Sequence, residues 1–281
     1  MKISVITVNL NDINGLRRTV SSIIEQTYKD YEYIVIDGGS TDGSREYIAS
    51  IDKINYWISE PDTGIYNAMN KGLSIAQGEY CIFMNSGDFF YNKNVLEEIA
   101  PFLQGKDFYA GQPILVKNGK LNCIKLPKII TLDFLFVWSL YHQCTFTKTT
   151  LLRKRPYNEN YRIVSDWEKF FKEWLLHTAS YEILDKIIAY HHLDGISSTN
   201  KALNEKERKD VIHKLIPESY YRKLERRFEA STNLGKFENK IYNSLHLSPI
   251  KRDLKIIRNS LKLLIRDIIN MIASPKRNYP T

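Results

Sequence analysis

Residues 3–43 of the chain read ISVITVNLNDINGLRRTVSSIIEQTYKDYEYIVIDGGSTDG. The apolar, β-branched run from Ile3 to Val8 predicts a strand, and Tyr33 to Ile36 predicts a second one. Between them, apolar residues recur every three or four positions from Gly15 to Gln26, which predicts a helix with one buried face. A strand, a helix and a strand in this order form a unit with two parallel strands. We therefore expect an α/β fold built on a mostly parallel sheet.

The same alternation continues beyond this stretch and then becomes less regular. Asn118-Gly119 predicts a hairpin turn, and Ser165 is the expected N-cap of a later helix. A Ser, Thr, Asn and Gly-rich stretch predicts a domain boundary near residue 200, followed by a helical region. The remaining elements are predicted as helices over Ser44 to Ala49, Gly64 to Ala76 and Asp166 to Leu176, and as strands over Ile54 to Ile58, Tyr80 to Met84, Phe108 to Ala110, Ile114 to Lys117, Leu121 to Ile124, Cys144 to Thr147, Tyr181 to Leu184 and Ile187 to His191.

The composition is that of a globular protein. Hydrophobic residues make up 43% of the 281 residues and charged residues 26%, which excludes a disordered or fibrous chain. No apolar run approaches the ~20 residues of a membrane-spanning helix, and the first apolar run is too short for a signal peptide, so we expect a cytoplasmic location. Cys81, Cys123 and Cys144 form no closely spaced pair, which favours three reduced core thiols over disulfides or a zinc site.

The net charge of +8 lies entirely in the C-terminal part of the chain. Residues 201–281 contain 19 Lys and Arg against 9 Asp and Glu. Within them, residues 250–273 carry apolar residues at spacings of three and four together with six cations, which predicts a basic amphipathic helix. Such a helix can lie on the anionic inner face of the cell membrane, or it can pack on protein, including in a homo-oligomer. The excess of cations favours the membrane.

Polar side chains gather where the predicted parallel strands end. Ligands of open α/β sheets bind at the carboxyl ends of the strands, so these residues are candidates for one site. They are Thr7 and Asn9 after the first strand, Asp37 after the second, Asp62 after the third, and Asn85 to Asp88 after the fourth.

Four spaced motifs give a more specific indication. They are Ile6-Thr7-Val8-Asn9, Ile34 to Gly43, Asp62 to Gly72 with the sequence DTGIYNAMNKG, and Met84 to Asp88 with the sequence MNSGD. Their order resembles that of the family 2 glycosyltransferases, which are inverting enzymes with the GT-A nucleotide-sugar fold. The resemblance covers about residues 1 to 195 and implies a nucleotide-binding part over about 1–105, an acceptor part over about 106–200, and a basic helical region over 201–281.

The resemblance also implies a set of donor-binding residues. Asp37 is expected to accept a hydrogen bond from the imide N–H of the donor's base, because an ionised carboxylate only accepts. Many relatives carry a second Asp where this chain has Gly38. Asp62 either touches the donor's ribose or sugar or caps the following helix, and both interpretations stay open. The other residues expected on the donor side are Thr7, Asn9, Tyr66, Asn70 and Asn85.

Metal and catalytic residues follow from the same resemblance. Asp88 is expected to hold Mn²⁺ or Mg²⁺ between the donor phosphates, since hard cations prefer oxygen ligands. Asp166, in Ser165-Asp166-Trp167, is the expected general base that takes the proton of the acceptor hydroxyl. His142, Gln143 and Trp167 are expected on the acceptor or pyrophosphate side of the pocket. His191 is expected in a core or supporting role, because His191 and His192 point to opposite faces of a strand.

The expected function is inverting transfer of a hexosyl or N-acetylhexosaminyl group, from a UDP-sugar in the first instance, to a saccharide or lipid-linked saccharide. Cell-envelope polysaccharide synthesis is the expected setting. One alternative is a sugar-nucleotide nucleotidyltransferase, which needs a Gly-rich first loop with Arg that residues 9–18 do not contain. The other is a nucleic-acid-binding protein, which the sequence disfavours because the body shows no basic face with interleaved aromatic residues.

Overall fold

The computed structural model describes residues 1–193, 195 and 199–226. The chain divides into two compact units, Met1–Leu224 and Glu225–Thr281, and all elements described below belong to the first. The amphipathic helix predicted over residues 250–273 lies outside the described residues. Among the described residues, no helix is both long enough and apolar enough to cross a membrane.

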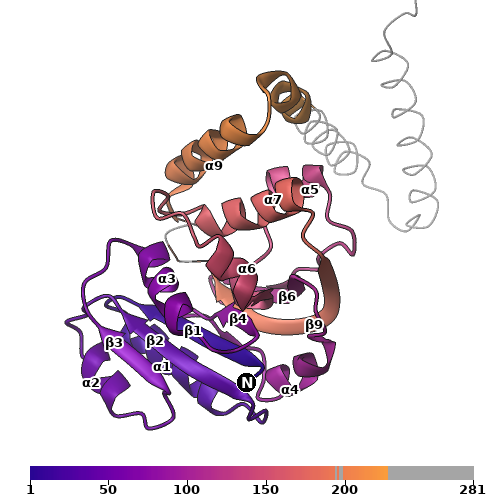
Figure 1. Ribbon diagram of the computed structural model, residues 1–281. Helices are drawn as coiled ribbons and strands as arrows, with labels where there is room; N and C mark the ends of the chain where they lie inside the picture. The colour runs from indigo at the N-terminus through magenta and orange to yellow at the C-terminus, as the bar shows by residue number, and fades with distance from the viewer. Residues whose placement is uncertain (194, 196–198, 227–281) are drawn as a thin grey trace, which may run out of the picture. The chain divides into compact units, whose positions relative to one another are not determined.

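A nine-stranded sheet forms the centre of the first unit, in the order β3-β2-β1-β4-β8-β6-β9-β5 with β7 paired to β6 (Figure 1). Its parallel part confirms the sequence prediction. It comprises β1 (Ile3–Asn9), β2 (Tyr31–Asp37), β3 (Tyr56–Ser59) and β4 (Tyr80–Phe83).

The second half of the sheet is mixed. β8 (Thr145–Lys148) runs antiparallel to both β4 and β6 (Phe108–Lys117), and β9 (Tyr181–His192) runs parallel to β6. β7 (Lys120–Cys123) forms the predicted hairpin with β6, and β5 (Phe89–Phe90) pairs antiparallel with β9.

Two strands are longer than the sequence pattern predicts. β6 and β9 are each continuous, whereas each was predicted as two short strands. Register shifts between Ala110 and Pro113 absorb the break in the apolar pattern, as a β-bulge does. A side chain at Gly111 would collide with Ile188 of β9, so the glycine allows the two strands to stay paired at the bulge.

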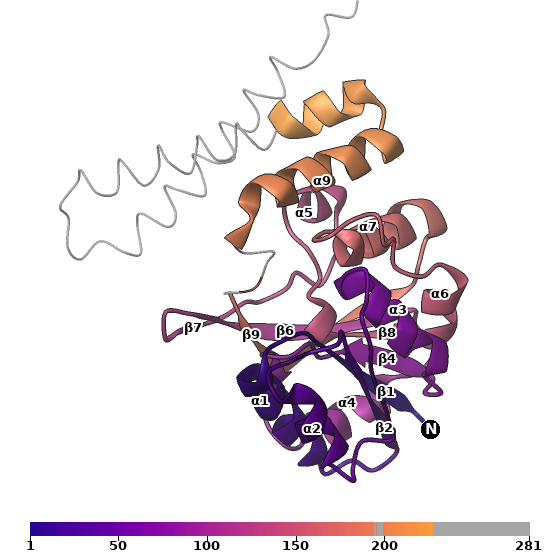
Figure 2. The same cartoon turned by 90° about the vertical axis from the view of Figure 1, so that its left-hand side faces the viewer.

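Helices cover both faces of the sheet (Figures 1 and 2). On one face α1 (Ile13–Ile24), α2 (Ser44–Ala49) and α4 (Val95–Ile99), followed by the 3₁₀ turn Ala100–Phe102, pack on the strands through a cluster that includes Val5, Leu16 and Leu96. On the other face α3 (Ile65–Ile75) and α6 (Thr149–Lys154) pack through a cluster that includes Ile6, Met69 and Leu152. The 3₁₀ turn His142–Cys144 precedes β8.

A third cluster joins the remaining helices. α5 (Leu132–Val137), α7 (Ser165–His177) and α9 (Lys201–Leu215) share buried residues that include Leu135, Phe171 and Val211. The boundary predicted near residue 200 therefore falls inside the compact unit, because α9 buries its apolar side chains against α7. The expectation of three core thiols is wrong for Cys123, which is exposed on the edge hairpin, while Cys81 and Cys144 are buried.

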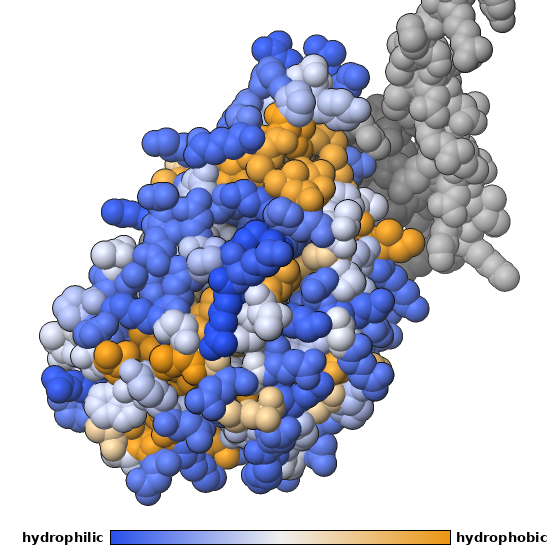
Figure 3. All heavy atoms as spheres, in the orientation of Figure 1, coloured by the Kyte–Doolittle hydropathy of each residue, from blue (hydrophilic) through white to orange (hydrophobic). Residues whose placement is uncertain are grey.

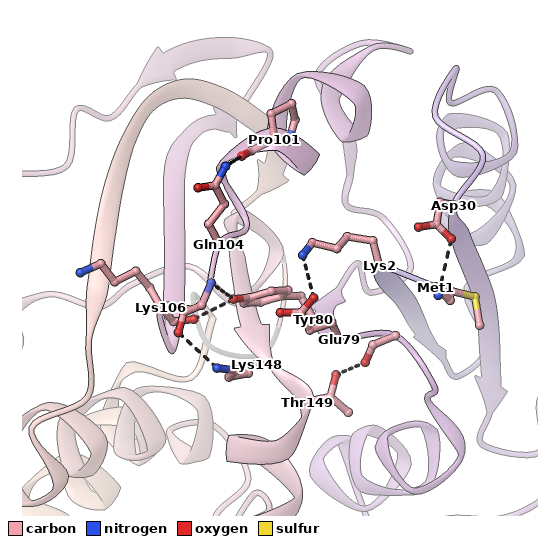
Figure 4. Close-up of polar contacts among 12 residues, drawn as sticks. Met1, Lys2, Asp30, Glu79, Tyr80, Pro101, Gln104, Lys106, Lys148 and Thr149 are labelled. Carbon is pink, nitrogen blue, oxygen red and sulfur yellow. Dashed lines mark hydrogen bonds and ion pairs between the residues drawn. The ribbon is translucent and has the colours of Figure 1, made fainter.

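The amino ends of the strands are tied together by internal contacts (Figure 4). Lys2 Nζ lies 2.7 Å from Glu79 Oε2, and the Tyr80 hydroxyl donates to the carbonyl of Lys106 at 3.0 Å. Thr149 Oγ1 donates to the carbonyl of Gly78 at 2.6 Å. The face in Figure 3 is mostly hydrophilic, with apolar residues visible over the region of α5, α7 and α9 in Figure 1. The residues considered below lie at the opposite, carboxyl ends of the parallel strands.

Candidate active site

Asp37 occupies the carboxyl end of β2, in register with Asn9 of β1 and Ser59 of β3. One carboxylate oxygen accepts hydrogen bonds from Asn9 Nδ2 at 2.8 Å and Ser40 Oγ at 2.5 Å; the other accepts from Ser59 Oγ at 2.6 Å and the Ser40 amide at 2.9 Å. Burial alone would raise the pKa of Asp37, but the bonds from Ser40, Ser59 and Asn9 outweigh it and lower the pKa. With no exposed surface and four donors, Asp37 braces the strand ends.

Thr7 and Asn9, the two predicted site residues of β1, differ in what they offer to a ligand. Thr7 is fully buried; its hydroxyl donates to the carbonyl of Met84 and accepts from Tyr33. These hydrogen bonds tie β1 to its neighbours, and the expectation that Thr7 brackets a nucleoside stays a prediction. Asn9 is 4% exposed and its Oδ1 has no hydrogen-bond partner among the described residues. A buried acceptor without a donor is costly, and a bound ligand can supply the donor.

The loop after β4 carries the expected metal ligand. Asp88 Oδ1 lies 2.9 Å from Nδ1 of His191, which β9 supplies, and Gly87 turns the loop with a positive φ of 96°. Asn85 Nδ2 lies 3.2 Å from His142 Nε2, and Asn85 Oδ1 is buried without a partner in the described chain. The supporting role expected of His191 takes a definite form here, since it holds the Asp88 carboxylate.

The oxygen atoms available at this loop suit a hard divalent cation. No group of three or more His, Cys, Asp and Glu side chains arranged to hold a metal occurs in the described parts of the chain. One carboxylate, from Asp88, and one unpartnered amide oxygen, from Asn85, are nevertheless present. Mg²⁺-type ions are commonly held by one or two carboxylates and completed by substrate phosphates and water. The residues therefore fit a cation that binds together with a diphosphate.

Asp166 lies in the first turn of α7 at the centre of a hydrogen-bond network. Its Oδ2 is 2.8 Å from His142 Nδ1, and its Oδ1 accepts from the Tyr66 hydroxyl and the Trp167 amide, both at 2.9 Å. Burial would raise the pKa of Asp166, but the hydrogen bond and charge of His142, with the bond from Tyr66, lower it. Burial alone would lower the pKa of His142, but the hydrogen bond to Asp166 and its charge outweigh burial, so the pKa is raised. Asp166 is therefore an ionised, oriented carboxylate whose side chain is still 18% exposed.

A continuous path joins this carboxylate to the β4 loop. If His142 Nδ1 carries the proton donated to Asp166, Nε2 accepts from the Asn85 amide, and both ring nitrogens are satisfied. The path Asn85, His142, Asp166 and Tyr66 combines residues from the β4–β5 loop, the turn before β8, α7 and α3. The structure thus brings together four of the predicted site residues from distant parts of the sequence.

Tyr66 and Asn70 lie on one face of α3, as their spacing predicts, and both contact residues of the segment before α7. Tyr66 also donates to the carbonyl of Ile163 at 2.6 Å. Asn70 exchanges hydrogen bonds with the backbone of Tyr157 and donates to Glu159 Oε1 at 2.8 Å. This face of α3 contacts the segment before α7 that leads to Asp166, and the expected contact of Tyr66 and Asn70 with the donor stays a prediction.

Glu207 of α9 holds the same loop and was missed in the sequence. Its carboxylate accepts from three consecutive backbone amides, of Arg162 and Ile163 at 2.9 Å and of Val164 at 3.3 Å. A sequence signal existed: Glu207 lies four residues from both Leu203 and Val211, so it falls on the apolar face of the helix. Ser165 is not the N-cap of α7, which is Val164; the Ser165 hydroxyl accepts from the Asn158 amide at 2.6 Å.

The residues expected on the acceptor side differ in what their side chains contact. Trp167 is buried; its Nε1 donates to the carbonyl of Leu135 at 2.7 Å, and the Arg208 guanidinium lies 4.5 Å from the ring centre. Trp167 therefore anchors α7 to α5, and its expected place on the acceptor side stays a prediction. Burial lowers the pKa of Arg208 to about 10.

Gln143 is buried with its Nε2 unpartnered among the described residues.

Asp62 lies in the loop between β3 and α3. The N-cap of α3 is Gly64, which makes no side-chain cap, so the capping interpretation of Asp62 is wrong. Asp62 Oδ1 instead accepts from the Gly64 amide at 2.9 Å in a tight turn.

The chain is similar in sequence to known glycosyltransferases. Residues 4–166 match the family model described as Glycosyl transferase family 2. An uncharacterised glycosyltransferase of Mycobacterium tuberculosis is 43% identical over 106 residues, which cover 37% of this chain and only 40% of that protein. A PGL/p-HBAD biosynthesis glycosyltransferase of Mycobacterium bovis is 29% identical over 209 residues, covering 70% of this chain and 79% of that protein.

Two solved structures are similar in fold. S. aureus TarS 1-349 in complex with UDP-GlcNAc superposes with a TM-score of 0.59 at 22% identity, covering 71% of this chain and 61% of that one. The mannosyltransferase PcManGT from Pyrobaculum calidifontis, in complex with GDP-Man and Mn²⁺, gives a TM-score of 0.53 at 15% identity, covering 71% and 59%.

Proposed function

The chain belongs to glycosyltransferase family 2 and has the GT-A fold, and from this premise we propose that it transfers a sugar with inversion from a nucleoside diphosphate sugar to an acceptor hydroxyl. The observation that carries the proposal is the hydrogen-bond path from Asn85 through His142 to Asp166. It connects a loop suited to a metal and diphosphate with a carboxylate suited to proton abstraction. Both reactants can then bind at one site.

The donor lies along the carboxyl ends of β1 to β4 in this proposal. Unpartnered oxygens of Asn9 and Asn85 support it, since both are buried acceptors at this edge. The structural neighbours bind UDP-GlcNAc and GDP-Man, which supports a nucleoside diphosphate sugar as the donor class. Among these we favour a UDP-sugar carrying a hexosyl or N-acetylhexosaminyl group.

Asp88 and Asn85 would hold Mn²⁺ or Mg²⁺. When bound, such a cation neutralises negative charge on the departing diphosphate. His191 keeps the Asp88 carboxylate in place through its 2.9 Å contact. The PcManGT complex with Mn²⁺ supports a divalent cation in this fold.

Asp166 is the proposed general base. As the acceptor oxygen attacks the anomeric carbon, its proton passes to the Asp166 carboxylate, and the bond from that carbon to the diphosphate oxygen breaks on the opposite face. The lowered pKa keeps Asp166 ionised at neutral pH and ready to accept the proton. His142 and Tyr66 fix the direction of its two oxygens.

The acceptor is a saccharide or lipid-linked saccharide of envelope glycan synthesis in this proposal. A relative named for PGL/p-HBAD biosynthesis supports a role in glycan assembly. The basic, amphipathic sequence over residues 250–273 supports an acceptor presented at the inner face of the membrane.

Substitution of the base tests the proposal. Asp166→Asn keeps the shape of the side chain, so donor binding should stay within about twofold of wild type while the transfer rate falls roughly 10²-fold or more. Asp88→Ala should weaken donor binding only when Mn²⁺ is present. Asp185→Asn, the same change at an exposed residue, is the control. Transfer at the wild-type rate by Asp166→Asn would reject Asp166 as the base.

A panel of nucleotide sugars identifies the donor. A ligand that binds only the folded state stabilises it by about 2.7 kcal/mol at 100 times Kd. The true donor should therefore raise the melting temperature in the presence of Mn²⁺ more than the other members of the panel.

A further inference from the structure

Arg208 of α9 is a partly buried cation that forms no ion pair among the described residues. Its guanidinium lies 4.5 Å from the centre of the Trp167 ring. It donates to two backbone carbonyls, of Phe136 and Trp138, each at 3.4 Å, which is long for such a bond. Most of its five N–H groups therefore have no acceptor in the described part of the chain.

The burial of this charge is not balanced by a neighbouring carboxylate. Burial lowers the pKa of Arg208 to about 10, and the charge of Asp166, which lies beyond ion-pair distance, opposes that shift only in part. The guanidinium is still charged at neutral pH. Trp167 and the carbonyls at the end of α5 hold the side chain in place, but none of them carries a negative charge. Since charges in protein interiors are normally paired, an anion is the ligand that this side chain favours.

The position of Arg208 connects it with the proposed base. Trp167, whose ring it faces, follows Asp166 in the first turn of α7. Glu207, the residue before Arg208, holds the backbone of residues 162–164, which leads into Asp166. The same turn of α9 thus fixes the loop before the base and places a cation near it. A group attached close to the reacting hydroxyl of an acceptor therefore comes near Arg208.

The surface beside Arg208 is apolar and aromatic. Val137 and Trp138, at the end of α5, are 39% and 40% exposed, and the carbonyl of Trp138 is one of the two that Arg208 contacts. Figure 3 shows apolar residues over the region that α5, α7 and α9 occupy in Figure 1. Ligand sites commonly combine such apolar and aromatic surface with a few placed polar groups. An apolar surface with one unpaired cation suits a sugar, which has apolar C–H faces, when that sugar carries an anionic group.

We propose that Arg208 binds an oxyanion of the acceptor, a phosphate or a carboxylate, near the hydroxyl that Asp166 activates. This assignment rests on the proposed function and narrows its acceptor class from saccharides in general to anionic ones. A guanidinium is planar and can give two parallel hydrogen bonds to either oxyanion. A neutral sugar cannot offer it a charge, so the site discriminates between acceptors by charge.

Titration calorimetry with the full chain tests the proposal. Mn²⁺ and UDP or GDP, whichever binds, are present in excess, so that the place of the donor's diphosphate is already filled. The probes are glucose 1-phosphate, glucuronic acid and, as the neutral sugar, methyl glucoside. A hydrogen bond that involves a charged group changes affinity about 10- to 100-fold. The wild type should bind one of the two anionic probes that much more tightly than methyl glucoside, and the probe that binds identifies the oxyanion.

Three variants assign the preference to one side chain. Arg208→Gln should bring the affinities for anionic and neutral probes to within about threefold of each other. Arg208→Lys keeps the charge without the planar fork and should retain part of the difference, which provides a second reading if the glutamine variant does not fold. Lys209→Gln removes the same charge from the next residue of α9, which is exposed, and should behave as wild type. A purely structural role of Arg208 would change the affinities for charged and neutral probes alike.

The outcomes separate this assignment from the proposed function. If the nucleotide binds with Mn²⁺ but neither anionic probe is preferred, or if folded Arg208→Gln keeps the preference, the assignment is overturned while the proposed function stands. If the preference appears only without nucleotide, the oxyanion occupies the place of the donor's diphosphate, and the assignment is again overturned. If neither UDP nor GDP binds, the proposed function fails, and with it the place of Arg208 at an acceptor. A preference lost in Arg208→Gln and kept in Lys209→Gln supports the assignment.

Discussion

Glu207→Gln tests whether α9 controls the position of the carboxylate of Asp166, the proposed base. Glu207 Oε2 accepts from the amides of Ile163 and Val164, and Oε1 accepts from that of Arg162. Glutamine offers one oxygen, so in its better orientation it keeps the first two amides and turns its own NH₂ group toward the third. One buried amide then loses its acceptor, which costs about 1–3 kcal/mol. The free energy of unfolding should fall by that amount.

The same substitution should lower the transfer rate without weakening the binding of the donor. Ile163 is also the residue whose carbonyl accepts from Tyr66, the hydroxyl that orients Asp166. A shift of this loop moves the base relative to the acceptor, and a displacement of about 1 Å can cost roughly 10²-fold in rate. We expect kcat to fall roughly 10- to 100-fold while the donor's KM stays within about twofold.

Urea unfolding and steady-state transfer assays on the same preparations measure both effects. Glu205→Gln is the matched control, since Glu205 is exposed on the same helix. It should behave as wild type in both assays. A Glu207→Gln protein that loses stability yet keeps the wild-type kcat would refute the reasoning, because the loop would then hold Asp166 without Glu207.

Three other perturbations have defined outcomes. Asp37 has a lowered pKa in the folded state, so its contribution to stability is fully present above the unfolded pKa of about 3.9 and is lost as pH falls through the folded pKa. In urea unfolding, the stability advantage of wild type over Asp37→Asn should therefore shrink from pH 7 to pH 3. An advantage that does not change with pH would contradict this. His142→Ala should lower kcat more than His142→Gln, because glutamine can still donate to Asp166, and equal losses would argue against an orienting role. A chain ended after Ser248 should no longer sediment with anionic vesicles at low salt but should keep donor binding; if it and the full chain sediment equally, the region after Ser248 does not bind the membrane.

Local sequence patterns predicted the parallel half of the sheet well. The runs that form β1, β2 and β4 are short, apolar and bounded by turn residues, so each carries its own signal. The second half was harder to predict because its strands depend on partners. β6 and β9 continue through positions where their own sequences suggest an interruption, since each supplies the other with hydrogen bonds across the bulge.

The sequence predicted candidate site residues but not the contacts that each of them makes, and their roles stay predictions. The spacing of Tyr66 and Asn70 placed them on one face of α3, but nothing in that spacing indicates that the face meets residues 157–166. The capping behaviour of Asp62 and Ser165 was misjudged because the choice of cap depends on which loop each side chain reaches. Glu207 was missed because its place on the apolar face of α9 indicates burial, but does not identify the three backbone amides of another segment that it accepts from.

The contacts that define the site have a consequence for the order of folding. Asp88 and His191 are 103 residues apart in the chain, and Tyr66 and Asp166 are 100 apart. Contacts between distant residues form slowly, because a long loop must close before any of them stabilises the fold. A growing chain that has reached residue 85 already contains β1 to β4, whereas Asp88 gains its partner only after β9 has been made and paired. The nascent chain can therefore pair its four parallel strands before the contacts of the candidate site exist, and the contact between Asp88 and His191 cannot form until residue 191 has been synthesised.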